Sequence, residues 1–151
     1  MGTKRVGWAR IRSLINENGN QLHSKLSRTK VVSADTTLTA ADSGTVIMMR
    51  ANGVDITLPA AENGMWFQVI LTENYDSAAC TVVAQADDFM TGQVAGPSAA
   101  AVNNGDGSDD LTATFGSDTV AGDQITLVSD GTLWYVTGTA RAGGANGIAF
   151  S

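Results

Sequence analysis

The chain has very little of what most catalytic and metal-binding sites need. Its 151 residues include one cysteine, Cys80, and one histidine, His23. A single cysteine cannot form an internal disulfide, and one Cys with one His cannot supply the four ligands of a structural zinc site. No lysine follows a run of glycines, so a phosphate-binding loop is missing too. These shortages predict a protein that is not an enzyme and that holds no cofactor or metal.

Long apolar runs and strong helix formers are scarce as well. No stretch is long enough to span a bilayer, and charges interrupt the apolar residues near the start. We therefore expect neither a transmembrane segment nor a signal peptide. Lys, Glu and Leu are few, whereas Thr, Val, Ala, Gly and Asp are frequent. This composition favours strands and turns, in a chain long enough for one domain with its own core.

What the chain does have is a sharp division of charge. Seven of its nine basic residues and one of its acids lie in the first thirty positions, so that segment carries a net charge of +6. Two basic residues stand against fourteen acids in the remainder, which gives residues 31–151 a net charge of −12. A basic segment joined to an acidic body suggests that the segment meets a partner while the body faces solvent.

Residues 1–30 are predicted to form a basic arm that contains one short amphipathic helix. Four apolar residues recur there at helical spacing, with arginines between them: Trp8, Ile11, Leu14 and Ile15. Asn18-Gly19 is suited to end the helix, because glycine adopts the left-handed conformation without strain. About two turns of helix are only marginally stable in water, so the helix must dock on something.

The candidate partners of the arm differ in how much they explain. Nucleic acid would suit the basic residues, with Trp8 stacked on a base, but an acidic body repels a polyanion. A membrane surface is a weaker fit, because the helix is short. A protein with an acidic and apolar surface explains both the charge and the apolar stripe, so we expect a protein partner and neither nucleic acid nor membrane. The residues expected to bind this partner are Lys4, Arg5, Trp8, Arg10, Ile11, Arg12, Leu14 and Ile15.

After the arm the apolar pattern changes to period two, which predicts strands. Asn52-Gly53 separates two such runs, residues 45–51 and 54–58, and is a strong hairpin signal. A second hairpin is expected around Ser129-Asp130-Gly131, with a return strand over residues 132–137. Turns at such short intervals predict an all-β domain, either an antiparallel β-sandwich or a jelly-roll-like barrel.

Three further stretches complete the predicted β domain, which spans residues 31–141. Residues 65–72 are apolar on both faces, as in a strand that is central in a sandwich or covered by a neighbouring subunit. Residues 87–110, rich in Gly, Asn and Asp, are expected to be a long exposed loop, broken by a short segment around Ala99–Val102. Residues 142–151 are expected to be a flexible tail, with Ile148 and Phe150 as a terminal anchor.

Three features could carry chemistry, and each has a structural interpretation that we favour. His23 lies in the arm, away from any predicted pocket. Cys80 shares one face of a predicted strand with Val82, so a buried structural thiol is expected. The acidic loop Asn104–Asp110 offers many oxygen ligands, but its glycines do not fall where an EF-hand needs one. A solvated turn is therefore preferred over a calcium site.

Several segments resemble a β module found in virion proteins of tailed bacteriophages. The module's opening is matched by residues 32–46, VSADTTLTAADSGTV, and by residues 54–59, VDITLP. Its Gly-led aromatic strand corresponds to Gly64-Met65-Trp66-Phe67, and its closing hairpin to residues 122–136. The resemblance covers residues 32–138, which is most of the chain.

Modules of this kind occur in capsid decoration (cement) proteins, head fibres, and tail-fibre or spike proteins. The short chain and its N-terminal arm are similar to decoration proteins, which implies attachment to the major capsid protein on the outer surface of the virion. The resemblance also implies a homotrimer over threefold or pseudo-threefold axes. The alternative is a head-fibre or tail-fibre type protein, in which the loop over residues 87–110 binds a host-surface glycan.

Overall fold

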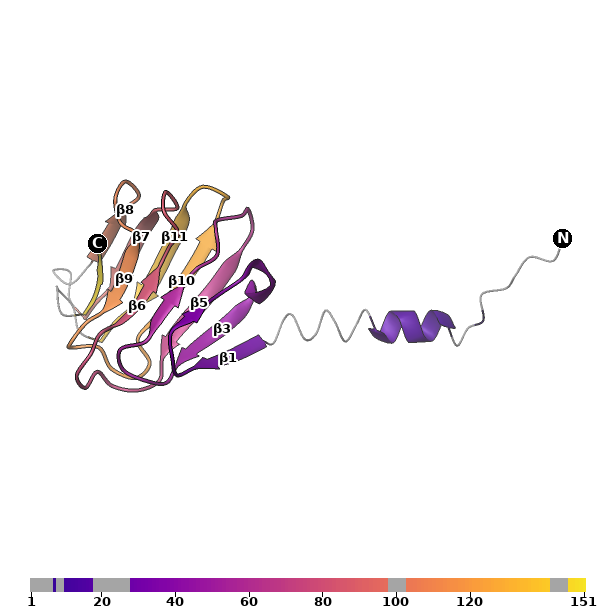
Figure 1. Ribbon diagram of the computed structural model, residues 1–151, viewed down its shortest axis with the longest axis horizontal. Coiled ribbons are helices and arrows are strands. Elements are labelled where there is room, and N and C mark those ends of the chain that lie inside the picture. Colours follow the sequence, from indigo (N-terminus) through magenta and orange to yellow (C-terminus); the bar gives the residue numbers. More distant parts are fainter. Residues whose placement is uncertain (1–6, 8–9, 18–27, 98–102, 142–146) are drawn as a thin grey trace.

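The computed structural model describes residues 7, 10–17, 28–97, 103–141 and 147–151. These residues form one short helix and two β-sheets that pack face to face (Figure 1). The predicted all-β sandwich with an N-terminal helix is confirmed. None of the helical residues in these ranges belongs to a helix that is long and apolar enough to cross a membrane.

The larger sheet has seven strands in the order β1-β3-β5-β10-β11-β7-β8. Their bounds are Arg28–Val32 (β1), Thr45–Met49 (β3), Trp66–Leu71 (β5), Gln124–Ser129 (β10), Trp134–Thr139 (β11), Met90–Ala95 (β7) and Asn103–Asp106 (β8). The smaller sheet has five strands in the order β12-β9-β6-β4-β2. Their bounds are Ile148–Phe150 (β12), Thr112–Phe115 (β9), Cys80–Val83 (β6), Asp55–Thr57 (β4) and Thr36–Thr37 (β2). A 3₁₀ turn, η1, covers Ala40–Asp42.

The first half of the sandwich alternates between the two sheets along the chain. Strands β1, β3 and β5 lie parallel in the seven-stranded sheet, and β2, β4 and β6 lie parallel in the five-stranded one. The chain therefore winds like the coils of a two-sheet solenoid before it enters the second half, where β10 and β11 form an antiparallel hairpin. Five of the ten strand pairs within the described residues are parallel, so the sheets are mixed and not purely antiparallel.

The two predicted hairpins have different outcomes. The one around Ser129-Asp130-Gly131 is confirmed, since β10 and β11 pair antiparallel on either side of it. The one at Asn52-Gly53 is wrong, because β3 and β4 belong to different sheets. Gly53 has the positive φ of +69° that the dipeptide favours, but its N–H donates to the carbonyl of Ala78 at 3.2 Å. The dipeptide fixes a tight turn, and long-range parallel pairing decides where the next strand goes.

The core lies between the sheets. It consists of the side chains at every second strand position, which point inward. Its largest fully buried side chains include Trp134, Phe67 and Phe115. The rings of Phe67 and Trp134 contact each other with centroids 5.8 Å apart. Side chains of this size each contribute about 1.5–3 kcal/mol by leaving water. Every buried apolar residue of this core lies between Val32 and Ile148.

The predicted exposed loop over residues 87–110 is wrong at ten of its 24 positions, where the structure has strands. Strands β7 and β8 occupy much of it and extend the seven-stranded sheet. Met90 and Val94 are buried in the core. Gly92, with φ +137°, lies so close to Val136 that a Cβ built there would be 1.9 Å from the Val136 carbonyl oxygen. The glycine that suggested a loop is required by close strand packing. Residues 99–102, where a short segment was expected, lie outside the described residues.

The sandwich also includes residues that the sequence assigns to the arm and to the tail. Strand β1 begins at Arg28, three positions before the expected boundary. At the other end Ile148 is fully buried, and the carbonyl of Ser151 accepts hydrogen bonds from the N–H groups of Leu111 (2.9 Å) and Thr112 (2.8 Å). The expected terminal anchor is therefore strand β12, and residues 142–146 lie outside the described ranges.

Candidate functional site

The helix of the arm covers residues 10–17 and lies outside the two sheets (Figure 1). It begins with hydrogen bonds from the N–H groups of Arg10 (2.8 Å) and Ile11 (3.3 Å) to the carbonyl of Gly7. The exposed fractions of its apolar side chains are 36%, 52% and 63% for Ile11, Leu14 and Ile15. We call these three residues the apolar stripe. The stripe is a surface that gains free energy when a partner covers it.

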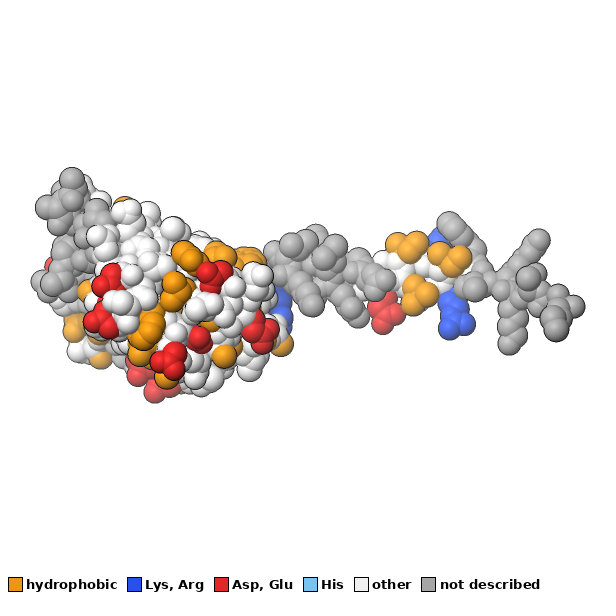
Figure 2. Space-filling model, turned by 90° about the horizontal axis from the view of Figure 1, so that it is seen from above, with side chains coloured by type: hydrophobic (Ala, Val, Ile, Leu, Met, Phe, Trp, Pro, Cys, Tyr) orange, Lys and Arg blue, Asp and Glu red, His pale blue; other side chains and the backbone are white. Residues whose placement is uncertain are grey.

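Charged side chains lie on the same helix. Arg10 and Arg12 near its start and Glu17 at its end are exposed. Figure 2 shows hydrophobic and basic side chains close together on the helix, whereas acidic side chains are scattered over the sandwich. The helix thus brings together five of the eight residues predicted to bind a partner: Arg10, Ile11, Arg12, Leu14 and Ile15.

The other three predicted binding residues, Lys4, Arg5 and Trp8, lie outside the described residues, as does His23. They stay predictions, made from charge and spacing alone.

Two basic residues at the end of the arm are used inside the sandwich. The guanidinium of Arg28 donates to the carbonyl of Ala41 at 2.6 Å, and the ammonium of Lys30 lies 3.3 Å from the carboxylate of Asp42. Asp42 also accepts a hydrogen bond from the N–H of Thr39 at 2.9 Å, and this bond is the main reason why the pKa of Asp42 is lowered. These contacts hold β1 against η1, so the part of the arm open to a partner ends before β1.

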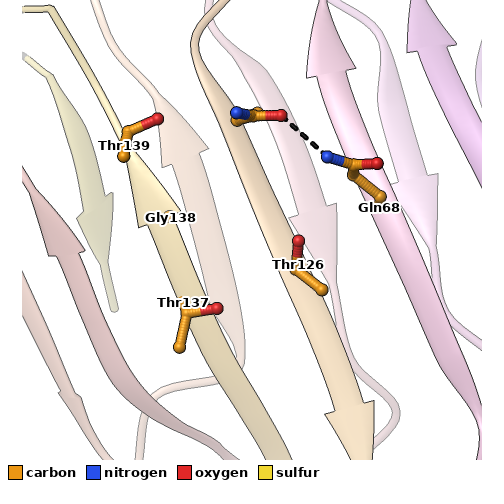
Figure 3. Close-up of a pocket in the computed structure, with 6 residues that line it drawn as sticks. Gln68, Thr126, Thr137, Gly138 and Thr139 are labelled. Atoms are coloured by element: carbon orange, nitrogen blue, oxygen red, sulfur yellow. Dashed lines mark hydrogen bonds between the residues drawn. The ribbon is translucent and has the colours of Figure 1, made fainter.

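A shallow polar groove lies on the outward face of the seven-stranded sheet (Figure 3). Its volume is about 250 Å³, and its lining residues are Gln68, Gln124, Thr126, Thr137, Gly138 and Thr139. The amide of Gln68 donates to the amide oxygen of Gln124 at 2.8 Å, which links β5 to β10. Amides and hydroxyls without a neighbouring base or acid do not form an activated nucleophile. The groove therefore suits contact with a surface better than it suits catalysis.

Near one end of the same face, Tyr135 and Asp130 form a second polar contact. The hydroxyl of Tyr135 donates to the carboxylate of Asp130 at 3.0 Å. The N–H groups of Leu133 (3.0 Å) and Thr132 (2.9 Å) donate to the other oxygen of that carboxylate. These two backbone hydrogen bonds, followed by the tyrosine, lower the pKa of Asp130. The same carboxylate raises the pKa of Tyr135. The contact fixes the orientation of an exposed aromatic ring.

The end of β8 and the loop that follows it gather three carboxylates. Oxygens of Asp106, Asp109 and Asp110 lie within 4.8 Å of one another. Asp106 accepts hydrogen bonds from the N–H (2.8 Å) and hydroxyl (2.7 Å) of Ser108, and the hydroxyl bond is the main cause of its lowered pKa. Asp110 in turn accepts from the N–H of Asp106 at 2.7 Å. The carboxylates thus serve as hydrogen-bond acceptors that shape the turn.

Cys80 is buried, as expected for a structural thiol. Its Sγ donates to the carbonyl of Ala51 at 3.1 Å, which joins the start of β6 to the turn that follows β3. The thiol is 2% exposed, so it is not presented to a substrate.

One surface was only partly anticipated from sequence. The doubly apolar run over residues 65–72 indicated extra cover for β5, and its outward residue Trp66 is indeed exposed. The sequence did not identify Val128 and Tyr135 as further residues of this surface, although Val128 lies beside Trp66 on β10 and Tyr135 lies beside Val128 on β11. These two residues can be recognised as part of the surface only when the strand register is known, because the register decides which residues become neighbours.

Comparisons with known protein families, curated proteins and solved structures found no match for this chain.

Proposed function

We propose that this chain is a capsid decoration protein of a tailed bacteriophage, a non-catalytic virion component that stabilises the head. Its arm would bind the outer surface of the shell built by the major capsid protein. The observation that carries the proposal is the exposed apolar stripe on a helix that also bears arginines, joined to an acidic β-sandwich. The resemblance of residues 32–138 to phage virion modules supplies the identity of the partner.

The arm contributes affinity through two kinds of contact. Burial of Ile11, Leu14 and Ile15 in an apolar groove gives about 1.5–3 kcal/mol for each side chain, before the cost of ordering the arm. The net charge of +4 in residues 1–27, five basic residues against one acid, adds attraction to acidic residues of the shell. Arg28 and Lys30 are engaged within the sandwich, so the binding charge comes from the residues before them.

The sandwich would determine on which side of the shell the protein lies and how many arms it presents. Its acidic surface disfavours contact with DNA, which supports a place on the outside of the shell. A homo-oligomer would present several arms at once. The resemblance implies that this oligomer is a trimer. Because linked arms bind at high effective concentration, modest affinity for each arm yields stable attachment.

Cosedimentation with empty capsids, assembled from the major capsid protein of the same phage, tests the proposal. The full chain should bind at a fixed copy number, and a chain that lacks residues 1–27 should not bind. This deletion keeps β1 intact, so its thermal unfolding should match that of the full chain. Trp8→Ala should lower the occupancy in the same assay.

Failure of both forms to bind would contradict the proposal. It would favour a head-fibre or tail-fibre type protein, which glycan screening of the same samples would then test.

A further inference from the structure

Exposed apolar side chains of the sandwich are confined to one surface. Among its described residues the exposed large hydrophobic side chains are Val31, Trp66, Val128 and Tyr135. All four lie on the seven-stranded sheet, at positions that alternate with buried core residues. They therefore point away from the core, on a surface that we call the outer face.

The strand registers bring these residues into rows. Trp66 lies beside Val128, and Val128 lies beside Tyr135, across β5, β10 and β11. A second row joins Val31 to Met48 and Ile70, across β1, β3 and β5. The polar groove continues the second row, since Gln124 pairs in register with Ile70, and it extends toward the first row through Gln68, which donates to Gln124. The outer face is thus an apolar, amide and hydroxyl surface across the centre of the sheet.

No carboxylate, lysine or arginine points outward from β3, β5, β10 or β11. This absence is notable because residues 31–151 carry fourteen acids. The outward side of the five-stranded sheet differs, since it carries the exposed Asp55, bonded to the hydroxyl of Thr81 at 2.6 Å. It also has none of the exposed large hydrophobic residues named above.

We propose that the outer face packs against the same face of a second copy of this chain. Two sandwiches repel one another, because residues 28–151 of each hold four basic residues against fourteen acids, a net charge of −10. The repulsion is least where their surfaces hold no charge. Sheets pack face to face through alternate side chains, and the central strands of the outer face offer uncharged side chains for such packing. The carboxylate of Asp130, which accepts the hydroxyl of Tyr135, lies at the end of this face. Arrangement of these faces as a twofold pair or around a threefold axis places Trp66, Val128 and Tyr135 in the interface.

The chemistry of the face favours protein over a neutral saccharide. Val31, Met48 and Ile70 form an apolar row that has no hydrogen-bonding side chain of its own. In the adjacent groove the amides of Gln68 and Gln124 are bonded to each other at 2.8 Å. Tyr135 directs its hydroxyl to Asp130 at 3.0 Å, so that donor is already used. Enrichment in aromatic and aliphatic side chains with few charges is typical of interface centres between subunits.

The test is the mass of the full chain in solution, measured by sedimentation velocity over a micromolar concentration series. The wild type should sediment as a multiple of the chain mass. Val128→Lys and Trp66→Lys should each weaken association at least about tenfold, because each places a charge in the interface. Thr114→Lys, on the outward side of the five-stranded sheet, is the matched control and should associate as the wild type does. Circular dichroism verifies that each variant is folded.

A wild type that stays monomeric throughout the series, or lysine variants that associate as tightly as the wild type, would overturn the proposal. Binding of neutral oligosaccharides by a monomeric wild type, lost in Trp66→Lys, would also overturn it and assign the face to glycans. The inference names the surface through which the homo-oligomer of the proposed function would form, and it does not depend on attachment by the arm. Deletion of residues 1–27 should abolish capsid binding and leave self-association unchanged, so the two proposals fail separately.

Discussion

The helix of the arm and the β-sandwich use the same apolar residue types in opposite ways. Ile47, Ile56 and Leu58 are fully buried between the sheets, whereas Leu14 and Ile15 on the helix are more than half exposed. The sandwich gains its stability from its own core. The residues of the apolar stripe are not among the residues of that core. The comparison teaches that the apolar residues that fold the sandwich and those proposed for attachment lie in separate parts of one chain. Substitutions in one part should leave the other unchanged.

The largest expected effect lies in the core. Trp134→Ala should lower the free energy of unfolding by about 3–5 kcal/mol, because the side chain is fully buried against Phe67. Leu14→Ala on the helix should change it by less than about 0.5 kcal/mol. Denaturant unfolding of the two variants measures the contrast. Equal losses would contradict the separation of the two parts.

The next effect tests the close approach of β7 to β11. Gly92→Ala should cost at least about 1–3 kcal/mol from backbone strain alone, and the overlap with Val136 adds to this cost. Gly64→Ala is the matched control, since Gly64 also has a positive φ, of +83°, but nothing lies within 4 Å of an added Cβ. Thermal unfolding of the pair separates strain from overlap. A smaller loss for Gly92→Ala than for Gly64→Ala would show that β7 does not pack as described.

A buried carboxylate provides a third contrast. Asp123 is 2% exposed and accepts hydrogen bonds from the N–H groups of Val120 (3.0 Å) and Arg141 (2.9 Å). Asp123→Ala should cost about 1–3 kcal/mol, because it removes the acceptor for these donors. Asp118→Ala, at an exposed position nearby, should change the stability by less than about 0.5 kcal/mol. Chemical denaturation of both variants checks this difference, and similar losses would refute the role given to Asp123.

The smallest effect concerns acid. The pKa of Asp42 and that of Asp130 are lowered from the ordinary value of 3.8 by hydrogen bonds. The folded state thus prefers their charged forms, so their contribution is complete above pH 3.8 and is lost as the pH falls through the lower folded values. The unfolding midpoint should decline in that acid range, and less in Asp42→Asn than in wild type. An identical decline in the variant would exclude Asp42 as a cause.

The sequence predicted the helix because its signal is local. The spacing of Trp8, Ile11, Leu14 and Ile15 indicates a helix there, and residues 10–17 are helical. The hairpin of β10 and β11 was also predicted, since its strands are neighbours in sequence and in space. Period-two alternation does not distinguish parallel from antiparallel neighbours, because both expose alternate residues. The coil-like path of β1 to β6 was therefore missed.

The outer face was missed for a related reason. Trp66 and Val128 are more than sixty positions apart in sequence and become neighbours only when β5 pairs with β10. The division of charge along the chain did not predict a surface whose central strands carry no charged side chain, because a net charge does not say where on the surface the charges lie. At Gly92 the sequence predicted a loop where the structure has a strand. A glycine within a polar stretch indicates a loop, and its role in close packing against Val136 appears only when the neighbouring strand is known.

The assignment of attachment to the arm is tested most directly by a triple variant, Ile11→Ala, Leu14→Ala and Ile15→Ala, alongside the control Ser13→Ala on another side of the helix. Both are added to empty capsids of the cognate major capsid protein, and bound copies per capsid are counted after sedimentation. We expect the triple variant to lose most of its occupancy while its unfolding midpoint matches that of the control. Normal occupancy of the triple variant would contradict attachment through the apolar stripe.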